Sequence, residues 1–244
     1  MKLTAPFISL LLAANIAAAG GATATAGDTA NTANTAPRAR QVGVAEAQSF
    51  VDKSVHVIDQ MKSDPGTAAL LRKSRGVLIV PDYLQAALIV GGRGGVGVLM
   101  DRHAGRWSGP AFFSISGLSV GLQAGGDAGA VAYLLMTQRA LKEFENRSGK
   151  FSLGADAGLT VASLSSSTNI VSTLPTADVI VWTATTGLFG GVAFDATDVA
   201  SNFRLDQAYY HQRVSMRRIL DNSVHNRLAD RLQMALGARV GPPQ

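Results

Sequence analysis

The chain has 244 residues, of which 47% are hydrophobic and 26 are glycine, so it can bury the core of one large domain. It contains no cysteine, which excludes disulfides, a thiolate nucleophile and a cysteine-attached lipid anchor. Charged residues make up only 16% of the chain and the formal net charge is +5, a balance more typical of a glycine-rich β protein than of a soluble helical enzyme.

Residues 1–19 predict an export signal. Lys2 supplies the positive end, residues 7–18 form an apolar stretch, and small residues precede Gly20, where we expect cleavage. The stretch is too short to cross a bilayer comfortably, and no later segment offers about 18 uninterrupted apolar residues. We therefore expect an exported protein, periplasmic or associated with the outer envelope, without a transmembrane helix.

Residues 20–41 are a low-complexity tract of small residues, which predicts a flexible leader because such a segment buries too little apolar area to offset its chain entropy. A single domain is predicted for residues 42–244. It opens with a helix, because apolar residues from Val44 to Met61 recur at steps of three and four. Pro65 predicts the start of a second helix.

The second helix is expected to end at a basic stretch. Arg72, Lys73 and Arg75 complement the negative end of a helix, and Gly76 suits a left-handed closing conformation. From Val77 onward the pattern changes to period two or to short apolar runs, which predict strands at 77–80, 86–90, 96–100, 118–124, 131–136, 151–161, 179–182 and 188–194, with a loop at 163–169.

A short helix is predicted from Thr137 to Phe144, between two groups of strands. Glycines lie within or beside many strands, where bulges and sharp curvature favour residues without a Cβ. The fold class predicted is α+β: a curled, largely antiparallel β-sheet or partly closed barrel with N-terminal and C-terminal flanking helices.

The closing segment predicts a basic amphipathic helix, because apolar residues step by four from Met216 to Leu236. Residues 204–244 hold seven arginines against three aspartates, including Arg213, Arg217 and Arg218. Such a helix can lie on anionic lipid headgroups. Alternatively, its apolar stripe docks on the sheet and its arginines face water.

Two strings resemble catalytic motifs. Residues 92–97 match GxGxxG, but a strand is predicted where a nucleotide site needs a helix, so a hairpin turn is favoured, with Arg93 placed to touch a phosphate. Residues 117–121 match GxSxG around Ser119; a serine hydrolase using His211 or His225 is the alternative, although no helix follows the serine. No catalytic residue, metal or cofactor is predicted.

Several motifs together resemble the SYLF domain family over residues 44–236. They occur in the family's order and spacing: Arg75 to Pro81, Trp107 to Phe113, Gly121 to Gly125, Lys150 to Ala157, Thr186 to Val192 and Ala208 to Tyr210. The resemblance implies lipid binding through an amphipathic helix and basic residues early in the domain, near Arg72, Lys73 and Arg75. Some yeast members bind actin, whereas bacterial relatives are exported.

The sequence thus predicts a non-enzymatic lipid-binding protein of the cell envelope, whose partner is anionic phospholipid and not nucleic acid; an exported protein meets phosphatidylglycerol or cardiolipin. A protein-binding envelope scaffold is the other alternative. Trp107, Phe112 and Phe113 are expected to anchor the core, with stacking on a ligand as the alternative. The lipid-binding residues predicted are Arg72, Lys73, Arg75, Arg93, Arg213, Arg217 and Arg218.

Overall fold

The computed structural model describes residues 29–87, 90–120, 125–146, 151–152, 159–165, 177–184 and 197–237. The chain divides into two compact units, Met1–Pro37 and Arg38–Gln244; α1 begins in the first, and the contacts described below belong to the second. The predicted export signal and the predicted strand at 188–194 lie outside the described residues. The division at residues 19 and 41 stays a prediction; the first helix begins at Thr29, within the tract predicted as a leader.

In the described chain, helices precede and follow the strands, and one helix lies between two of the strands. The helices are α1 (Thr29–Ser63), α2 (Pro65–Lys73), α3 (Gln138–Asn146), α4 (Phe203–Tyr210), α5 (Met216–Leu220), the 3-10 helix η2 (Arg227–Ala229) and α6 (Asp230–Ala235). The strands are β1 (Gly76–Ala87), β2 (Val90–His103), β3 (Arg106–Trp107), β4 (Ala111–Val120), β5 (Gly125–Leu135), β6 (Phe151–Ser152), β7 (Val161–Ser165), β8 (Val179–Thr183) and β9 (Thr197–Ser201).

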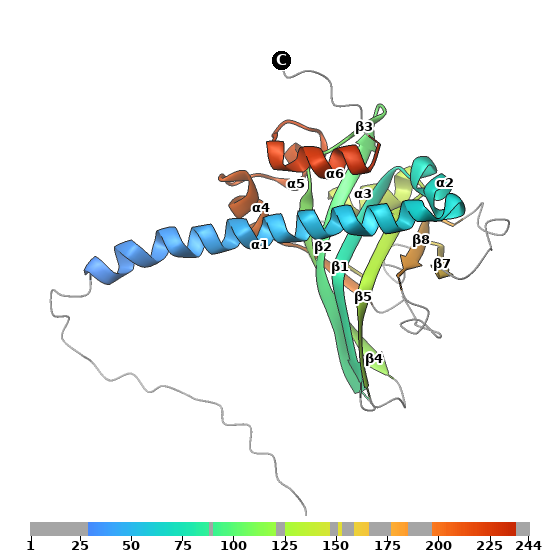
Figure 1. Ribbon diagram of the computed structural model, residues 1–244, viewed down its shortest axis with the longest axis horizontal. Helices are drawn as coiled ribbons and strands as arrows, with labels where there is room; N and C mark the ends of the chain where they lie inside the picture. The colour runs from blue at the N-terminus through green and yellow to red at the C-terminus, as the bar shows by residue number, and fades with distance from the viewer. Residues whose placement is uncertain are drawn as a thin grey trace, which may run out of the picture. The chain divides into compact units, whose positions relative to one another are not determined.

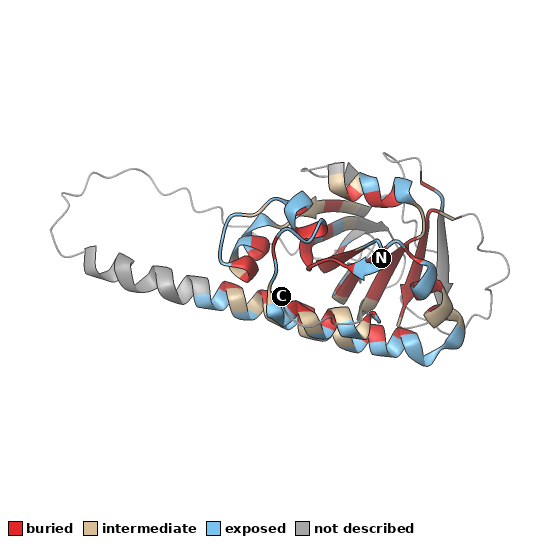
Figure 2. Ribbon diagram, turned by 90° about the horizontal axis from the view of Figure 1, so that it is seen from above, coloured by how far each residue is buried: buried red, intermediate tan, exposed pale blue. Residues whose placement is uncertain are grey.

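The helical stripe predicted from Val44 to Met61 is confirmed in α1. Ala47, Val51, Ile58 and Met61 are fully buried, and the buried positions of α1 face the sheet while exposed positions face away (Figure 2). Each such Val, Ile or Met contributes roughly 1.5–3 kcal/mol relative to leaving it exposed. Figure 1 shows α1 running across one face of β1, β2 and β5.

α2 begins as its sequence predicts. The Asp64 side chain accepts a hydrogen bond from the Thr67 backbone N–H at 2.6 Å, and Pro65 occupies the first turn. Its end differs from the prediction: Ser74 closes the helix in an extended conformation, and Gly76 is the first residue of β1. The strand therefore starts as soon as the helix stops, which fixes the distance between the last turn of α2 and the sheet.

The strands form one sheet in the order β6-β9-β4-β2-β1-β5-β8-β7, with β3 added to β2. All pairings are antiparallel except that of β7 with β8. Among the described residues no pairing joins β6 to β7, so the sheet is open there. The α+β class with a largely antiparallel sheet and flanking helices is confirmed. The loop predicted at 163–169 is wrong in its first part, because β7 continues to Ser165.

Neighbouring side chains on β4 separate the two faces of the sheet. Phe112 contacts Tyr209 of α4, with ring centroids 5.5 Å apart, and Phe113 contacts Phe144 of α3 at the same separation. Since successive strand residues point to opposite faces, α3 and α4 cover opposite sides of β4. α1 lies on the α4 side, where a Cβ on Gly43 would meet Ala208 at 3.2 Å.

The single amphipathic helix predicted from Met216 to Leu236 is wrong. α5 ends at Leu220, and the chain turns through Asn222, which has a positive φ of 59°, before η2 and α6 begin. Asn tolerates this left-handed conformation better than most residues. The apolar stripe is nonetheless largely buried, including Met216, Leu220 and Leu232. The alternative, in which the stripe docks on the body and the arginines face water, is the observed one.

Candidate functional site

The register of β1 and β2 brings the basic end of α2 to a hairpin. Gly76 pairs with Asp101, so the next residues outward, Arg75 and Arg102, are neighbours, and the Arg102 backbone N–H donates to the Arg75 carbonyl at 2.7 Å. The Arg102 side chain also reaches α2, where its Nη1 donates to the Arg72 carbonyl at 2.6 Å. Because α2 ends at Lys73, its last turn is tied directly to β2.

A tight turn adds one more cation beside this junction. Ala104 and Gly105 both have positive φ, 48° and 80°, which is the conformation of a two-residue type I′ hairpin and favours glycine. The turn pairs Arg106 with His103 and Trp107 with Arg102. We call Arg72, Lys73, Arg75, Arg102 and Arg106 the basic cluster.

The basic cluster carries uncompensated charge. Arg72, Lys73, Arg75 and Arg106 are exposed and Arg102 is half-buried, and none of the five has an ion-pair partner in the part of the chain that the structure describes. Two cations on or beside α1 are instead neutralised: Lys53 pairs with Asp82 at 2.6 Å, and Arg204 with Glu46 at 2.9 Å. Five like charges at one end of the sheet form an anion-attracting surface.

The nearest carboxyl group in sequence lies beneath this surface. Asp101 is buried, and burial raises its pKa to about 6, assisted by repulsion from Glu145 and opposed by His103. The Asp101 backbone N–H donates a hydrogen bond to the Ser108 hydroxyl at 2.9 Å, which holds this residue in the interior. Asp101 therefore presents little carboxylate surface that would screen the cluster from an external anion.

Trp107 anchors the hairpin to the C-terminal helices. Arg102 lies over its ring at 5.6 Å from the centroid, and its indole N–H donates to the Leu236 carbonyl at 3.2 Å. The Gln233 side-chain amide donates to the carbonyls of Trp107 and Ser108 at 3.1 and 3.0 Å. The cluster is thus held by contacts that span more than half of the chain.

The aromatic residues of the motif from Trp107 to Phe113 are structural. Trp107, Phe112 and Phe113 are all at most 5% exposed, so the expectation that they anchor the core agrees with their burial and the ligand-stacking alternative is not supported. The Tyr210 hydroxyl donates to the Pro110 carbonyl at 2.9 Å, joining α4 to the same segment. The motif segments at 121–124, 153–157 and 186–192 lie outside the described residues.

The seven residues predicted from the sequence fall into three places. Arg72, Lys73 and Arg75 belong to the basic cluster. Arg213, Arg217 and Arg218 are exposed on α5 and the segment before it, and Figure 1 shows α5 and α2 on opposite sides of β3. The seven residues therefore do not lie together, and their role in lipid binding stays a prediction.

Arg93 lies apart from the other six predicted residues. It lies inside β2, paired in register with Gln85 of β1 and Gly117 of β4, and is only 8% exposed. Its charge acts on two buried tyrosines: burial raises the pKa of Tyr83 and of Tyr133, and Arg93 opposes both shifts. Arg93 is therefore not part of the exposed basic cluster, and its role in lipid binding stays a prediction.

The structure adds Arg102 and Arg106, which the sequence analysis missed. Their signal is the Ala104-Gly105 pair between two basic residues, since a two-residue turn ending in glycine predicts a hairpin. The position of this hairpin beside α2 depends on the β1–β2 register, which joins residues far apart in the sequence, so local pattern alone does not predict it.

Neither catalytic-looking string has the required context. Residues 92–97 lie within β2, so no helix begins after the glycines. Ser119 lies in β4 in register with Gly91, and not on a strand-to-helix turn, so the serine hydrolase alternative is not supported. Among the described residues no three His, Asp or Glu side chains gather as a metal site, and no described helix has the length and hydropathy needed to cross a membrane.

Comparison with known proteins gives a consistent set of relatives. A family model described as "Ysc84: Las17-binding protein actin regulator" matches residues 116–239. "LAS seventeen-binding protein 3" of Saccharomyces cerevisiae is 24% identical over 159 residues, which cover 64% of this chain and 34% of the relative. "SH3 domain-containing YSC84-like protein 1" of Xenopus laevis is 26% identical over 145 residues, covering 59% of this chain and 43% of the relative.

The human protein of the same name is 26% identical over 147 residues, covering 59% of this chain and 42% of the relative. The chain thus spans between a third and a half of the length of these relatives. No solved structure gives a significant match. The segment matched by the family model begins at Ser116, so it includes α4 and α5 but not the basic cluster.

Proposed function

We propose that this chain, which belongs to the Ysc84 family (the SYLF domain family of the sequence resemblance), is a non-enzymatic module. It associates reversibly with anionic phospholipid through the basic cluster. One observation carries the proposal: five cations at one end of the sheet lack ion-pair partners among the described residues, while cations beside α1 are paired. An exported protein would meet such lipid at the envelope surface.

The strength expected of this association is modest. A Lys or Arg beside an anionic membrane surface contributes about 1 kcal/mol, so five contribute about 5 kcal/mol at most. At physiological ionic strength the attraction decays over about 8 Å, so binding weakens with added salt. The cluster alone therefore gives association that reverses readily.

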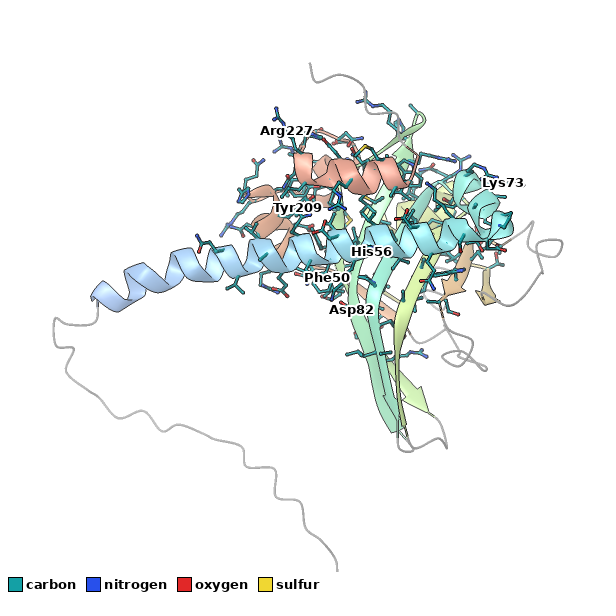
Figure 3. All side chains as sticks on the ribbon, viewed as in Figure 1. Phe50, His56, Lys73, Asp82, Tyr209 and Arg227 are labelled. Atoms are coloured by element: carbon teal, nitrogen blue, oxygen red, sulfur yellow. The ribbon has the colours of Figure 1, made fainter. Side chains whose placement is uncertain are left out.

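Co-sedimentation with vesicles tests the proposal. Lys73→Gln with Arg106→Gln removes two exposed cations of the cluster, and Lys142→Gln with Arg227→Gln removes two exposed cations outside it; Figure 3 shows Lys73 and Arg227 far apart in the view. The vesicles contain phosphatidylglycerol mixed with phosphatidylcholine. We expect the first double variant to bind them about 30-fold more weakly, because two cations contribute about 2 kcal/mol, and the second double variant to change binding less than threefold.

Equal loss in both double variants would mean that only net charge matters, which would contradict a site at the cluster. Binding to pure phosphatidylcholine as strong as to the anionic mixture would contradict the electrostatic basis. Circular dichroism of each variant, unchanged from the parent, establishes that the fold is retained.

A protein-binding scaffold is the second candidate, and the names of the relatives favour it. The yeast relative is named as a Las17-binding protein and the family as actin regulators. The aligned segment covers only 34% of that yeast protein, so experiment must decide whether it contains the region that contacts Las17. Co-sedimentation with actin filaments, without lipid, distinguishes this function from the first.

A further inference from the structure

A small groove lies on the outer side of α4, away from the basic cluster. α4 ends at Tyr210, and His211 adopts a left-handed conformation with φ 57°, which reverses the chain. The reversed segment places Arg213 and Val214 beside Phe203 and Gln207 of α4, around a hollow of about 320 Å³.

The lining of the groove is amphipathic. Phe203 is 48% exposed, although it is a large apolar residue, and Val214 is half-buried beside it. Arg213 and Gln207 are exposed and supply guanidinium and amide donors. The lining therefore offers apolar contact and hydrogen-bond donors side by side, the combination that a ligand with a charged group and an apolar part requires.

The charge around the groove favours an anion. Arg213 has no ion-pair partner among the described residues, and neither have Arg217 and Arg218 one turn further along. The neighbouring Arg204 is already paired with Glu46. The four residues that line the groove are Phe203, Gln207, Arg213 and Val214. None of these four is acidic, so the lining offers no carboxylate to bind a cation.

We propose that this α4–α5 groove holds the glycerophosphate region of one anionic phospholipid, with phosphate on Arg213 and Gln207 and the first carbons of the acyl chains on Phe203 and Val214. A volume of about 320 Å³ is at the small end of ligand pockets, so it fits a headgroup region and not a whole lipid. The inference rests on the proposed function and deepens it: the basic cluster attracts the protein to the membrane, and the groove retains it.

A tryptophan reporter tests the groove directly. In Phe203→Trp the new indole lies at the groove, whereas Trp107 and Trp182 are 5% and 2% exposed and provide a constant background. On addition of phosphatidylglycerol vesicles we expect a blue-shifted emission, and quenching by lipid brominated near the glycerol. Leu228→Trp is the matched control, because Leu228 is 46% exposed on η2 and does not line the groove; its emission should stay unchanged.

Arg213→Gln in the reporter protein should weaken the response about fivefold, equivalent to the loss of about 1 kcal/mol. A silent Phe203→Trp reporter in protein that co-sediments with vesicles would overturn the groove and leave the proposed function intact. A response to inorganic phosphate as strong as the response to lipid would also overturn it, because the acyl contact would then contribute nothing.

Monomeric short-chain phosphatidylglycerol separates the two proposals. If it shifts the reporter emission while vesicles leave the protein in the supernatant, the groove stands and membrane association through the cluster fails. If neither short-chain lipid nor vesicles change the emission, the groove is wrong.

Discussion

The buried carboxyl of Asp206 should make the folding stability of this protein fall as pH rises toward neutrality. Asp206 is 1% exposed on α4, its Oδ1 accepts a hydrogen bond from the Phe112 N–H at 2.9 Å, and its Oδ2 has no hydrogen-bond partner in the described structure. Burial raises the pKa of this carboxyl to about 7, and the Phe112 hydrogen bond opposes the shift.

The sign and size follow from proton linkage. Between pH 3.8 and about 7 the folded protein holds a proton at Asp206 that the unfolded chain has released, so the free energy of unfolding falls as pH rises. The contribution is fully present below pH 3.8 and is lost above about pH 7. The loss amounts to roughly 4 kcal/mol, at 1.36 kcal/mol for each unit of pKa.

Asp206→Asn isolates this effect. The amide oxygen still accepts from Phe112, but the side chain never ionises, so we expect the free energy of unfolding at pH 8 to rise by about 2 kcal/mol, the remainder being offset by an unpaired amide N–H. At pH 4.5 the variant should be no more stable than the parent. Urea denaturation followed by tryptophan fluorescence at pH 4.5, 6, 7 and 8 measures both proteins.

All other titratable groups are common to the two proteins, so the difference between their pH profiles reports residue 206 alone. Parallel profiles from pH 4.5 to 8 would refute the reasoning, since they would mean that the carboxyl is not shifted in the folded protein. Asp206→Ala provides a control: it also cannot ionise, but it removes the acceptor for the Phe112 N–H, so it should be less stable than Asp206→Asn at every pH.

Two further substitutions test contacts within the fold. Asp178 accepts hydrogen bonds from Arg139, Thr137 and Thr160, which outweigh the opposing effect of burial and lower the pKa of its carboxyl. Asp178→Asn should cost about 2 kcal/mol in urea denaturation at pH 7 and progressively less as the pH falls below 3.8, because the contribution of the ionised carboxyl is lost toward its lowered folded-state pKa. Gly95→Ala would place a Cβ 2.6 Å from the Asp82 carbonyl oxygen and should lower the free energy of unfolding by about 1–3 kcal/mol. Gly92→Ala is the control: its Cβ would meet nothing within 4 Å, so the free energy of unfolding should change by less than about 0.5 kcal/mol. Equal effects of the two substitutions would contradict the close approach at Gly95.

Local chemistry explains the parts of the fold that the sequence predicts well. The α1 stripe depends only on apolar spacing, and the start of α2 depends on one cap, where Asp64 accepts from Thr67. Thr137 likewise caps α3, its hydroxyl accepting from the Ala140 N–H at 3.2 Å. Such features are decided within one helical turn, so spacing and residue type suffice to find them.

Features that depend on residues distant in the sequence were harder to predict. Apolar residues from Met216 to Leu236 are buried with helical spacing, but two short helices satisfy this spacing as well as one long helix, because both pack on the same body. The break itself had a local signal in Asp221 and Asn222: the Asp221 side chain accepts from the Ser223 N–H at 2.9 Å and competes with helix continuation. Arg93 is enclosed by strand pairings that residue type alone does not reveal.

The distribution of ion pairs, more than the count of arginines, decides where this chain can attract an anion. The closing segment holds most of the excess arginine, yet Arg231 of α6 lies 3.8 Å from Asp52, and Arg204 of α4 is paired with Glu46. Both acids belong to α1, so the long helix neutralises the cations nearest to it. Among the described residues, the cations without such partners include the basic cluster at the β2–β3 hairpin and the arginines beside the α4–α5 groove. Because the second of these adjoins exposed apolar surface at Phe203, attraction and retention at a membrane would depend on different residues, and should be separable by substitution.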